Sequence, residues 1–136
     1  MDMSDEQAQA RVPVTILRLQ GEVDGSNYRQ VIARVKGLYE AGARHLLIDL
    51  AGVPYMSSAG LVALHSASLL FQKQPLPDPD YGWRSIHALG ETEEAGRQPF
   101  VKLLKLQPRV ASVLDQTGML PYFEVFDDEA AALAAF

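Results

Sequence analysis

The chain has no cysteine, and this absence removes several kinds of site at once. Among its 136 residues there is no thiol, so a disulfide framework, a thiolate zinc site and a cysteine nucleophile are excluded. Positive charge is also scarce, with 12 Lys and Arg against 17 Asp and Glu and a net charge of -5. An acidic chain without a block of Lys or Arg lacks the electrostatic footprint of a nucleic-acid-binding protein. No nucleic acid is therefore expected among its partners.

Long apolar runs are missing as well. No stretch approaches the ~18 residues of a membrane-spanning helix, and the polar residues 1–10 do not have the pattern of a secretory signal. We therefore expect a cytoplasmic protein that does not contact a membrane. Hydrophobic residues make up 48% of the chain and charged residues 21%, which is an ordinary globular balance. At this length the sequence predicts a single domain over residues 1–136 with one core.

The spacing of apolar residues alternates between the periods of strands and helices. Short, nearly continuous apolar runs predict strands at residues 12–19, 45–50, 100–106 and 122–126. Steps of three and four residues predict helices at residues 26–41, 57–73, 108–118 and 129–136. This alternation is typical of an α/β domain with a mostly parallel or mixed sheet of four to five strands and about four helices. Residues 1–11 predict an additional edge strand.

Turn-forming residues mark the ends of these elements and one exceptional segment. Prolines and glycines punctuate residues 75–99, which predicts an insertion or long surface loop within the domain. Ser26 or Asp24 is expected to cap the start of the first helix, and Gly42 lies where a left-handed residue ends it. Asp127 and Asp128 together supply a cap for the closing helix.

Two adjacent hydroxyl groups lie where a predicted central strand leads into the next helix. Ser57 and Ser58 follow the loop at residues 51–56, and in α/β sheets function gathers where strands end and helices begin. A serine in this place is often a structural N-cap. It can also be a phosphorylation site, because a phosphate is tolerated at a helix N-terminus and changes what docks there. The pattern by itself leaves both interpretations open.

Several segments around this turn resemble the STAS domain, a family named for sulfate transporters and anti-sigma factor antagonists. The resemblance is carried, in the family's order and spacing, by residues 17–24, 46–61, 113–119 and 123–131. It covers most of the chain outside residues 75–99. The resemblance implies a STAS-like (SpoIIAA-like) single α/β domain and a regulatory protein-binding module that is not an enzyme and has no cofactor or metal.

The resemblance also implies a mechanism of partner switching. Stand-alone members of the family bind an anti-sigma factor that is a serine kinase of the histidine-kinase-like ATPase type. Binding occupies the kinase and frees its sigma factor. Phosphorylation of the antagonist prevents binding, and a serine phosphatase resets the switch.

The position of the usual phosphate acceptor differs in this sequence. When the family motif is aligned on Gly60 and Leu61, that position holds Ala59, which has no hydroxyl. Ser58, one residue earlier, is the preferred candidate for phosphorylation, and Ser57 is the second. If neither is modified, the chain is instead a non-phosphorylated scaffold subunit of a larger sensory or signalling assembly.

The partner is expected to bind the surface around the same turn. This predicted surface consists of Asp24, Tyr55, Met56, Ser57, Ser58, Ala59, Gly60 and Leu61. Tyr55, Met56 and Leu61 are expected to supply its apolar part, because aromatic residues and Met are enriched at interfaces, although core packing is the alternative for each. A phosphate here would oppose docking, since an unpaired charge is costly to bury.

Asp49 and the histidines offer further candidates. Asp49, inside an apolar strand, is expected to be buried and hydrogen-bonded to loop amides, which would hold the serine turn in place. A hydrolase that uses Ser58, Asp49 and a histidine is another hypothesis, but its nucleophile needs a base within ~3 Å. The histidines lack metal-ligand spacing and fall on a strand, a helix and a loop, namely His45, His65 and His87.

Overall fold

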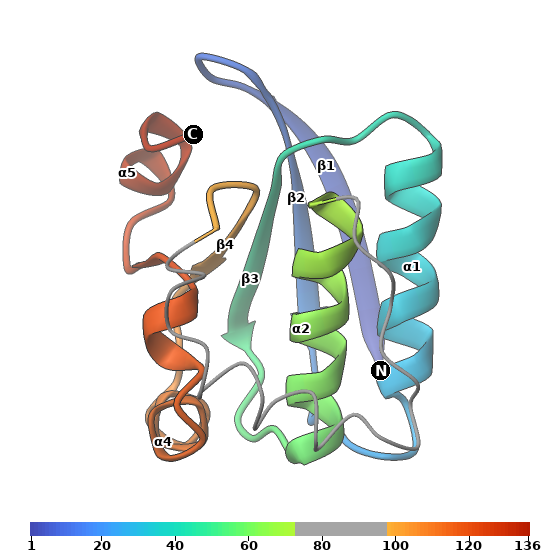
Figure 1. Cartoon of the computed structure of the whole chain (residues 1–136), viewed down its shortest axis with the longest axis vertical. Coiled ribbons are helices and arrows are strands. Elements are labelled where there is room, and N and C mark those ends of the chain that lie inside the picture. The colour runs from blue at the N-terminus through green and yellow to red at the C-terminus, as the bar shows by residue number, and fades with distance from the viewer. Residues whose placement is uncertain (73–97) are drawn as a thin grey trace.

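A computed structural model describes residues 1–72 and 98–136 of the chain, and within these residues a five-stranded sheet has the order β1-β2-β3-β4-β5 (Figure 1). The strands are β1 (Asp2–Gln9), β2 (Pro13–Gln20), β3 (Leu46–Gly52), β4 (Val101–Leu104) and β5 (Val125–Phe126). The helices are α1 (Tyr28–Glu40), α2 (Ser58–Phe71), α4 (Pro108–Gln116), the 3-10 helix η3 (Leu120–Tyr122) and α5 (Glu129–Ala134). The expected insertion at residues 75–99 lies outside the described residues, apart from its last two positions.

The sheet is mixed, as predicted. β1 pairs with β2 in antiparallel orientation and forms the expected edge strand. The pairs β2-β3, β3-β4 and β4-β5 are all parallel. Because parallel strands end on the same side, the segments that follow β2, β3 and β4 lie together at the lower end of the sheet in Figure 1. We call this region the carboxyl edge and define it by residues 21–27, 53–58 and 105–109.

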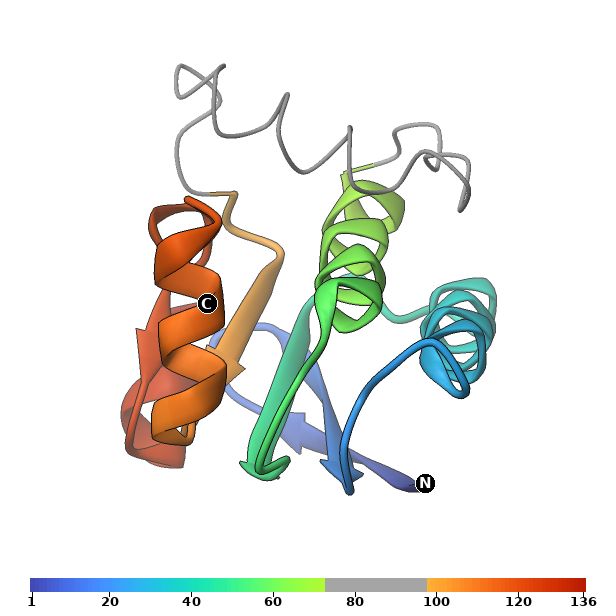
Figure 2. The same ribbon diagram turned by 90° about the horizontal axis from the view of Figure 1, so that it is seen from below.

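Helices cover the two faces of the sheet unequally. α1, α2 and α4 lie along one face (Figure 2) and enclose the larger core, which α4 joins through Val110 and Leu114. The short α5 covers a smaller cluster on the other face, consisting of Val14, Ile16, Leu47, Leu104 and Ala132. The alternation of side chains along β2 and β3 explains this division, since successive residues of a strand point to opposite faces.

α2 is the central helix of the molecule. All residues from Leu61 to Ser68 are buried, and apart from His65 their side chains are apolar or small. Gly60 lets the start of α2 approach the loop before it, because a Cβ there would overlap the side chain of Met56 and lie 3.2 Å from Val23 Cγ1. The backbone at the carboxyl edge is therefore packed tightly beneath its surface.

Two predicted details of the fold are wrong. The last strand does not cover residues 122–126, because Leu120–Tyr122 form a 3-10 helix and only Val125–Phe126 pair with β4. The N-cap of α1 is Asn27 rather than Ser26 or Asp24. The Asp24 carboxylate instead accepts hydrogen bonds from Ser26 in the loop before the helix.

Two other helix ends agree with prediction. Gly42 follows α1 with a φ of +116°, the left-handed conformation that a glycine adopts without a steric penalty. Asp128 caps α5 by accepting a hydrogen bond from the Ala131 N–H at 3.1 Å. Among the helices described, none has the length and apolar character needed to cross a membrane.

Candidate functional site

Hydrogen bonds join the first two loops of the carboxyl edge. Val23, after β2, forms a parallel bridge with Met56, after β3. The Val23 N–H donates to the Tyr55 carbonyl at 3.2 Å, and the Ser57 N–H donates to the Val23 carbonyl at 2.9 Å. Both bridge side chains are buried. The loop before α1 and the start of α2 therefore form one continuous surface.

The structure assigns different environments to the two adjacent serines. Ser57 is half-buried and caps α2, its Oγ accepting a hydrogen bond from the Ala59 N–H at 3.2 Å. Ser58 is the first residue of the helix and is exposed. In the described part of the chain its hydroxyl has no hydrogen-bond partner. Ser57 is thus the structural N-cap, and the Ser58 hydroxyl is accessible from solvent.

Three members of the predicted partner surface are core residues instead. Met56 and Leu61 have 0% exposure, and Gly60 is buried with them. The prediction that these residues contact a partner is wrong, because the requirement for an apolar core beneath the turn places them on its inner side. They support the surface from below.

The remaining members lie at the surface. Tyr55, Asp24 and Ala59 are partly exposed. The guanidinium of Arg109 lies over the Tyr55 ring, 4.5 Å from its centroid. The candidate site therefore reduces to Asp24, Tyr55, Ser57, Ser58 and Ala59.

Asp24 gives this site a fixed negative charge. Its Oδ1 accepts hydrogen bonds from the Ser26 hydroxyl at 2.6 Å and the Ser26 N–H at 2.9 Å. These two hydrogen bonds hold the pKa of Asp24 below its usual value, and the bond from the Ser26 hydroxyl has the larger effect. Asn27 braces the same loop, accepting from the Asp24 N–H at 3.0 Å and donating to the Glu22 carbonyl at 2.8 Å. The loop is therefore held by its own side chains.

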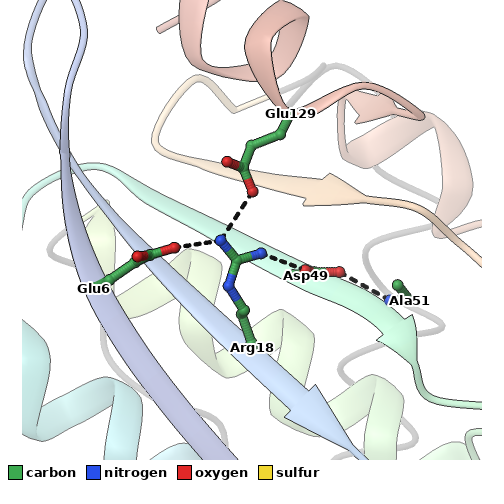
Figure 3. A network of polar contacts seen from close by, with 5 residues as sticks. All are labelled: Glu6, Arg18, Asp49, Ala51 and Glu129. Carbon is green, nitrogen blue, oxygen red and sulfur yellow. Dashed lines mark hydrogen bonds and ion pairs between the residues drawn. The ribbon is translucent and has the colours of Figure 1, made fainter.

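Asp49 is buried, as expected, but its backbone hydrogen bond is to an amide within β3 and not to the loop amides that were expected. Its Oδ1 accepts from the Ala51 N–H at 2.9 Å, and its Oδ2 accepts from Arg18 at 2.6 Å (Figure 3). Arg18 also contacts Glu6 of β1 and Glu129 of α5, the latter at 2.9 Å. The pKa of Arg18 is raised mainly by its hydrogen bond to Glu6, and the hydrogen bond to Asp49 has the second largest effect.

This Arg18 cluster was not foreseen from the sequence. The signal available was a charged residue inside each of two adjacent apolar strands, and their register pairs Arg18 with Asp49. The contribution of Glu129, which is 111 positions away, had no local signal. The side chains of Arg18, Glu6 and Glu129 are partly exposed, and the contacts of Arg18 join β2 to β1, β3 and α5.

A second unforeseen contact ties α4 to the carboxyl edge. The Gln107 side-chain amide donates to the Ala51 carbonyl at 2.6 Å. Together with the stack of Arg109 on Tyr55, this bond makes the start of α4 part of the same surface.

The two histidines that the structure describes do not assemble a catalytic group with the serines. His45 packs against the rings of Phe100 and Phe136. His65 is buried in α2, its Nδ1 has no hydrogen-bond partner in the described ranges, and burial lowers its pKa. Neither histidine hydrogen-bonds to Ser58 within residues 1–72 and 98–136, and His87 lies outside them. No group of three or more Asp, Glu or His side chains suited to a metal ion occurs in these same ranges.

The fold and the exposed serine turn define a STAS-type regulatory domain, and residues 6–75 match the STAS domain family. The chain belongs to that family. It is 33% identical over 119 residues to a protein of Bordetella bronchiseptica (strain ATCC BAA-588 / NCTC 13252 / RB50) named "Putative anti-sigma factor antagonist BtrV". The aligned region covers 87% of this chain and 82% of that protein.

Solved structures share the fold at low sequence identity. An anti-sigma factor antagonist from Mycobacterium paratuberculosis has a TM-score of 0.66 at 16% identity, covering 98% of this chain and 93% of that one. The phosphorylated form of the Bacillus cell fate determinant SpoIIAA has a TM-score of 0.58 at 17% identity, covering 96% of both chains. These matches confirm the predicted STAS-like fold. The similarity to anti-sigma factor antagonists supports a regulatory role.

Proposed function

We propose that this protein is an anti-sigma factor antagonist that acts by partner switching, with Ser58 as its phosphate acceptor. The observation that carries the proposal is the exposed Ser58 hydroxyl at the start of α2, beside a serine that is already used as the cap. A kinase reaches the Ser58 hydroxyl without disturbing the cap. Ala59, at the usual acceptor position, has no hydroxyl to modify.

The proposed partner is an anti-sigma factor that is also a serine kinase of the histidine-kinase-like ATPase type. The curated relative is named as an anti-sigma factor antagonist, and such an antagonist requires an anti-sigma factor to bind. A serine phosphatase would return the chain to its binding form. This role would place the protein in the cytoplasm and requires no catalysis by the chain itself.

A phosphate on Ser58 would alter docking through its charge. It carries roughly -1.5 to -2 charges at neutral pH and would stand at the carboxyl edge that already holds the ionised Asp24. The helix N-terminus tolerates the added charge, so the fold persists. A partner that buries this surface must desolvate the phosphate, and its affinity falls.

Phosphate mapping tests the acceptor. The wild-type chain, Ser58→Ala and Ser57→Ala are incubated with ATP and the anti-sigma kinase encoded in the same genome, and the modified residue is located by mass spectrometry. Labelling is expected in the wild type and Ser57→Ala and absent in Ser58→Ala. Label that persists in Ser58→Ala would refute the assignment.

A binding assay tests the switch. Ser58→Asp is expected to raise the Kd for the same kinase about tenfold, which corresponds to about 1.4 kcal/mol. Ser4→Asp is the matched control, because Ser4 is exposed on β1 and receives the same charge away from the carboxyl edge. Equal affinities of Ser58→Asp and the wild type would contradict a switch at this serine.

A scaffold subunit that is not phosphorylated is the second candidate function. Ala59 favours it, since the usual acceptor position has lost its hydroxyl. Stable binding to a signalling assembly, with no phosphate on any serine after incubation with the kinase, would select this alternative.

A further inference from the structure

Two positive side chains lie at one end of the carboxyl edge without a carboxylate partner. Lys105 follows β4, Arg109 lies in the first turn of α4, and both are exposed. Neither forms an ion pair in the part of the chain that the structure describes. Among the other described basic residues, Arg18, Arg34 and Lys102 each contact an acidic side chain, whereas the exposed Lys36 does not.

Arg109 is held in place although no carboxylate of residues 1–72 or 98–136 binds it. Its guanidinium carbon lies 4.5 Å from the centroid of the half-buried Tyr55 ring. The side chain of Gln107, the N-cap of α4, donates to the Ala51 carbonyl at 2.6 Å, so the start of α4 is anchored to the end of β3. A guanidinium stacked on an aromatic ring keeps its N–H donors available for a planar acceptor. Its restricted side chain also loses less conformational entropy on binding.

The backbone fixes the direction of Lys105 as well. Lys105 has a φ of +57°, the left-handed region that residues other than glycine seldom adopt. Its N–H donates to the Phe126 carbonyl at 2.7 Å, which continues the β4-β5 ladder and holds this conformation. The side chain thus leaves the sheet at a defined position on the carboxyl edge.

The strand order spreads the charges of this edge along a line. Glu22 and Asp24 follow β2, Ser58 follows the central β3, and Lys105 and Arg109 follow β4. The acceptor serine therefore lies between an acidic segment and a basic one. Arg29, in the first turn of α1, lies along the Tyr28 ring beside the acidic segment.

We propose that the partner-binding surface extends from Ser58 across Tyr55 onto α4, and that Arg109, assisted by Lys105, binds a carboxylate of the anti-sigma factor. This inference rests on the proposed function, since it concerns the same docking event. A protein carboxylate is the acceptor we assign. A nucleic-acid backbone would meet only two cations beside an acidic loop on a chain of net charge -5, which is too little positive charge to hold it.

Charge reversal with a matched control tests the inference. The Kd for the purified anti-sigma factor is measured for the wild type, Arg109→Glu and Lys36→Glu at two salt concentrations. Lys36 is exposed in the middle of α1, so its reversal changes the net charge equally but away from the carboxyl edge. Arg109→Glu is expected to raise the Kd tenfold or more and to reduce its salt dependence, whereas Lys36→Glu changes it less than about twofold.

A second pair of variants tests the stack. Tyr55→Phe keeps the ring beneath Arg109 and is expected to bind like the wild type. Tyr55→Leu removes the ring and is expected to raise the Kd about threefold or more, chiefly through faster dissociation. Thermal unfolding of each variant confirms that it is folded before its affinity is interpreted.

The outcomes separate this inference from the proposed function. A wild-type chain that binds no anti-sigma factor overturns both. A wild-type chain that binds, together with an Arg109→Glu variant of equal affinity, overturns only the inference. Equal losses in Arg109→Glu and Lys36→Glu overturn it too, because they show an effect of net charge rather than of a specific contact.

Discussion

His65 is a buried base whose Nδ1 has no hydrogen-bond partner among the residues that the structure describes. It lies in the middle of α2, and its ring meets the Tyr122 ring edge-on at 6.1 Å between centroids. Burial disfavours the charged imidazolium and lowers the pKa of His65 in the folded chain. The unfolded chain therefore binds this proton at a higher pH than the folded chain does.

The free energy of unfolding is therefore expected to decrease as the pH falls. Above the unfolded pKa of about 6.5 His65 is neutral in both states and the fold keeps its full stability. As the pH falls from there towards the lower folded pKa, stability is lost at a rate of at most about 1.4 kcal/mol per pH unit. Urea unfolding between pH 7.5 and 5 should show this loss in the wild type and a smaller one in His65→Phe. Equal slopes in both proteins would contradict the assignment.

Gly60 is needed because α2 begins in contact with the loop before it. A methyl group there would overlap Met56 and press on Val23, both of which are buried. Gly60→Ala is expected to destabilise the fold by about 1–3 kcal/mol through overpacking. Gly37→Ala is the matched control, because nothing lies within 4 Å of its Cβ position in α1. It should stabilise by roughly 0.5–1 kcal/mol, and denaturant unfolding of the two variants compares them.

At the scale of the element, the start of α2 is stabilised by a side-chain cap from Ser57, and Ser58 does not contribute to this cap. The Ser57 hydroxyl accepts the Ala59 N–H, which satisfies one of the amides left unpaired at a helix start. Ser57→Ala is expected to lower the unfolding free energy by about 1 kcal/mol. Ser58→Ala should change it by less than about 0.5 kcal/mol, because this residue is exposed. Equal effects of the two substitutions on thermal unfolding would show that the cap is misassigned.

At the scale of the whole molecule, Arg18 connects segments from both ends of the chain. It contacts Glu6 near the start, Asp49 in the centre and Glu129 near the end (Figure 3). Its side chain is 33% exposed, whereas that of Asp49 is only 10% exposed. Removing the guanidinium would leave the buried Asp49 charge with only the Ala51 N–H. Solvent screens the other two contacts more strongly.

Arg18→Met tests this connection. It is expected to destabilise the fold by about 1–3 kcal/mol, chiefly because the Asp49 carboxylate remains buried without its counter-charge. Arg34→Met is the control, because Arg34 forms a single ion pair among the described residues, with Asp5 of β1, and both side chains of the pair are partly exposed. This substitution should lower the free energy of unfolding by about 0–1 kcal/mol. Urea unfolding at low and high salt measures both. A loss for Arg18→Met no larger than that of Arg34→Met would show that Asp49 does not depend on Arg18.

Elements with strong local signals were predicted well. The positions of the helices and of β2 and β3 follow from apolar period, and Gly42 ends α1 as its left-handed conformation predicts. The predictions that rested on weak local signals, for the last strand and the cap of α1, were wrong. The last strand is confined to Val125–Phe126, because its predicted start at residue 122 ends a 3-10 helix. Asn27 rather than Ser26 precedes α1, because several polar residues in that loop compete for the same backbone amides.

The exposure of the residues in the candidate site was not predictable in detail from the sequence. A pair of serines before a helix indicates one cap and one free hydroxyl, yet the sequence does not say which is which. Met56 and Leu61 look alike as interface or core residues in sequence, and their 0% exposure depends on what packs beneath the turn. The stack of Arg109 on Tyr55 joins residues 54 positions apart, so no local sequence pattern predicts it.

The amino-acid order alone determined the α/β alternation, the likeness to STAS domains and the presence of a hydroxyl pair at a strand-to-helix turn, because these depend on neighbours within a few residues. Tertiary structure decided which serine is exposed, which apolar side chains are sealed beneath it, and which charges meet across the sheet. Those outcomes depend on strand register and on helix packing, which bring distant residues within 3–5 Å of one another. Contacts of that kind arise only when the chain has folded.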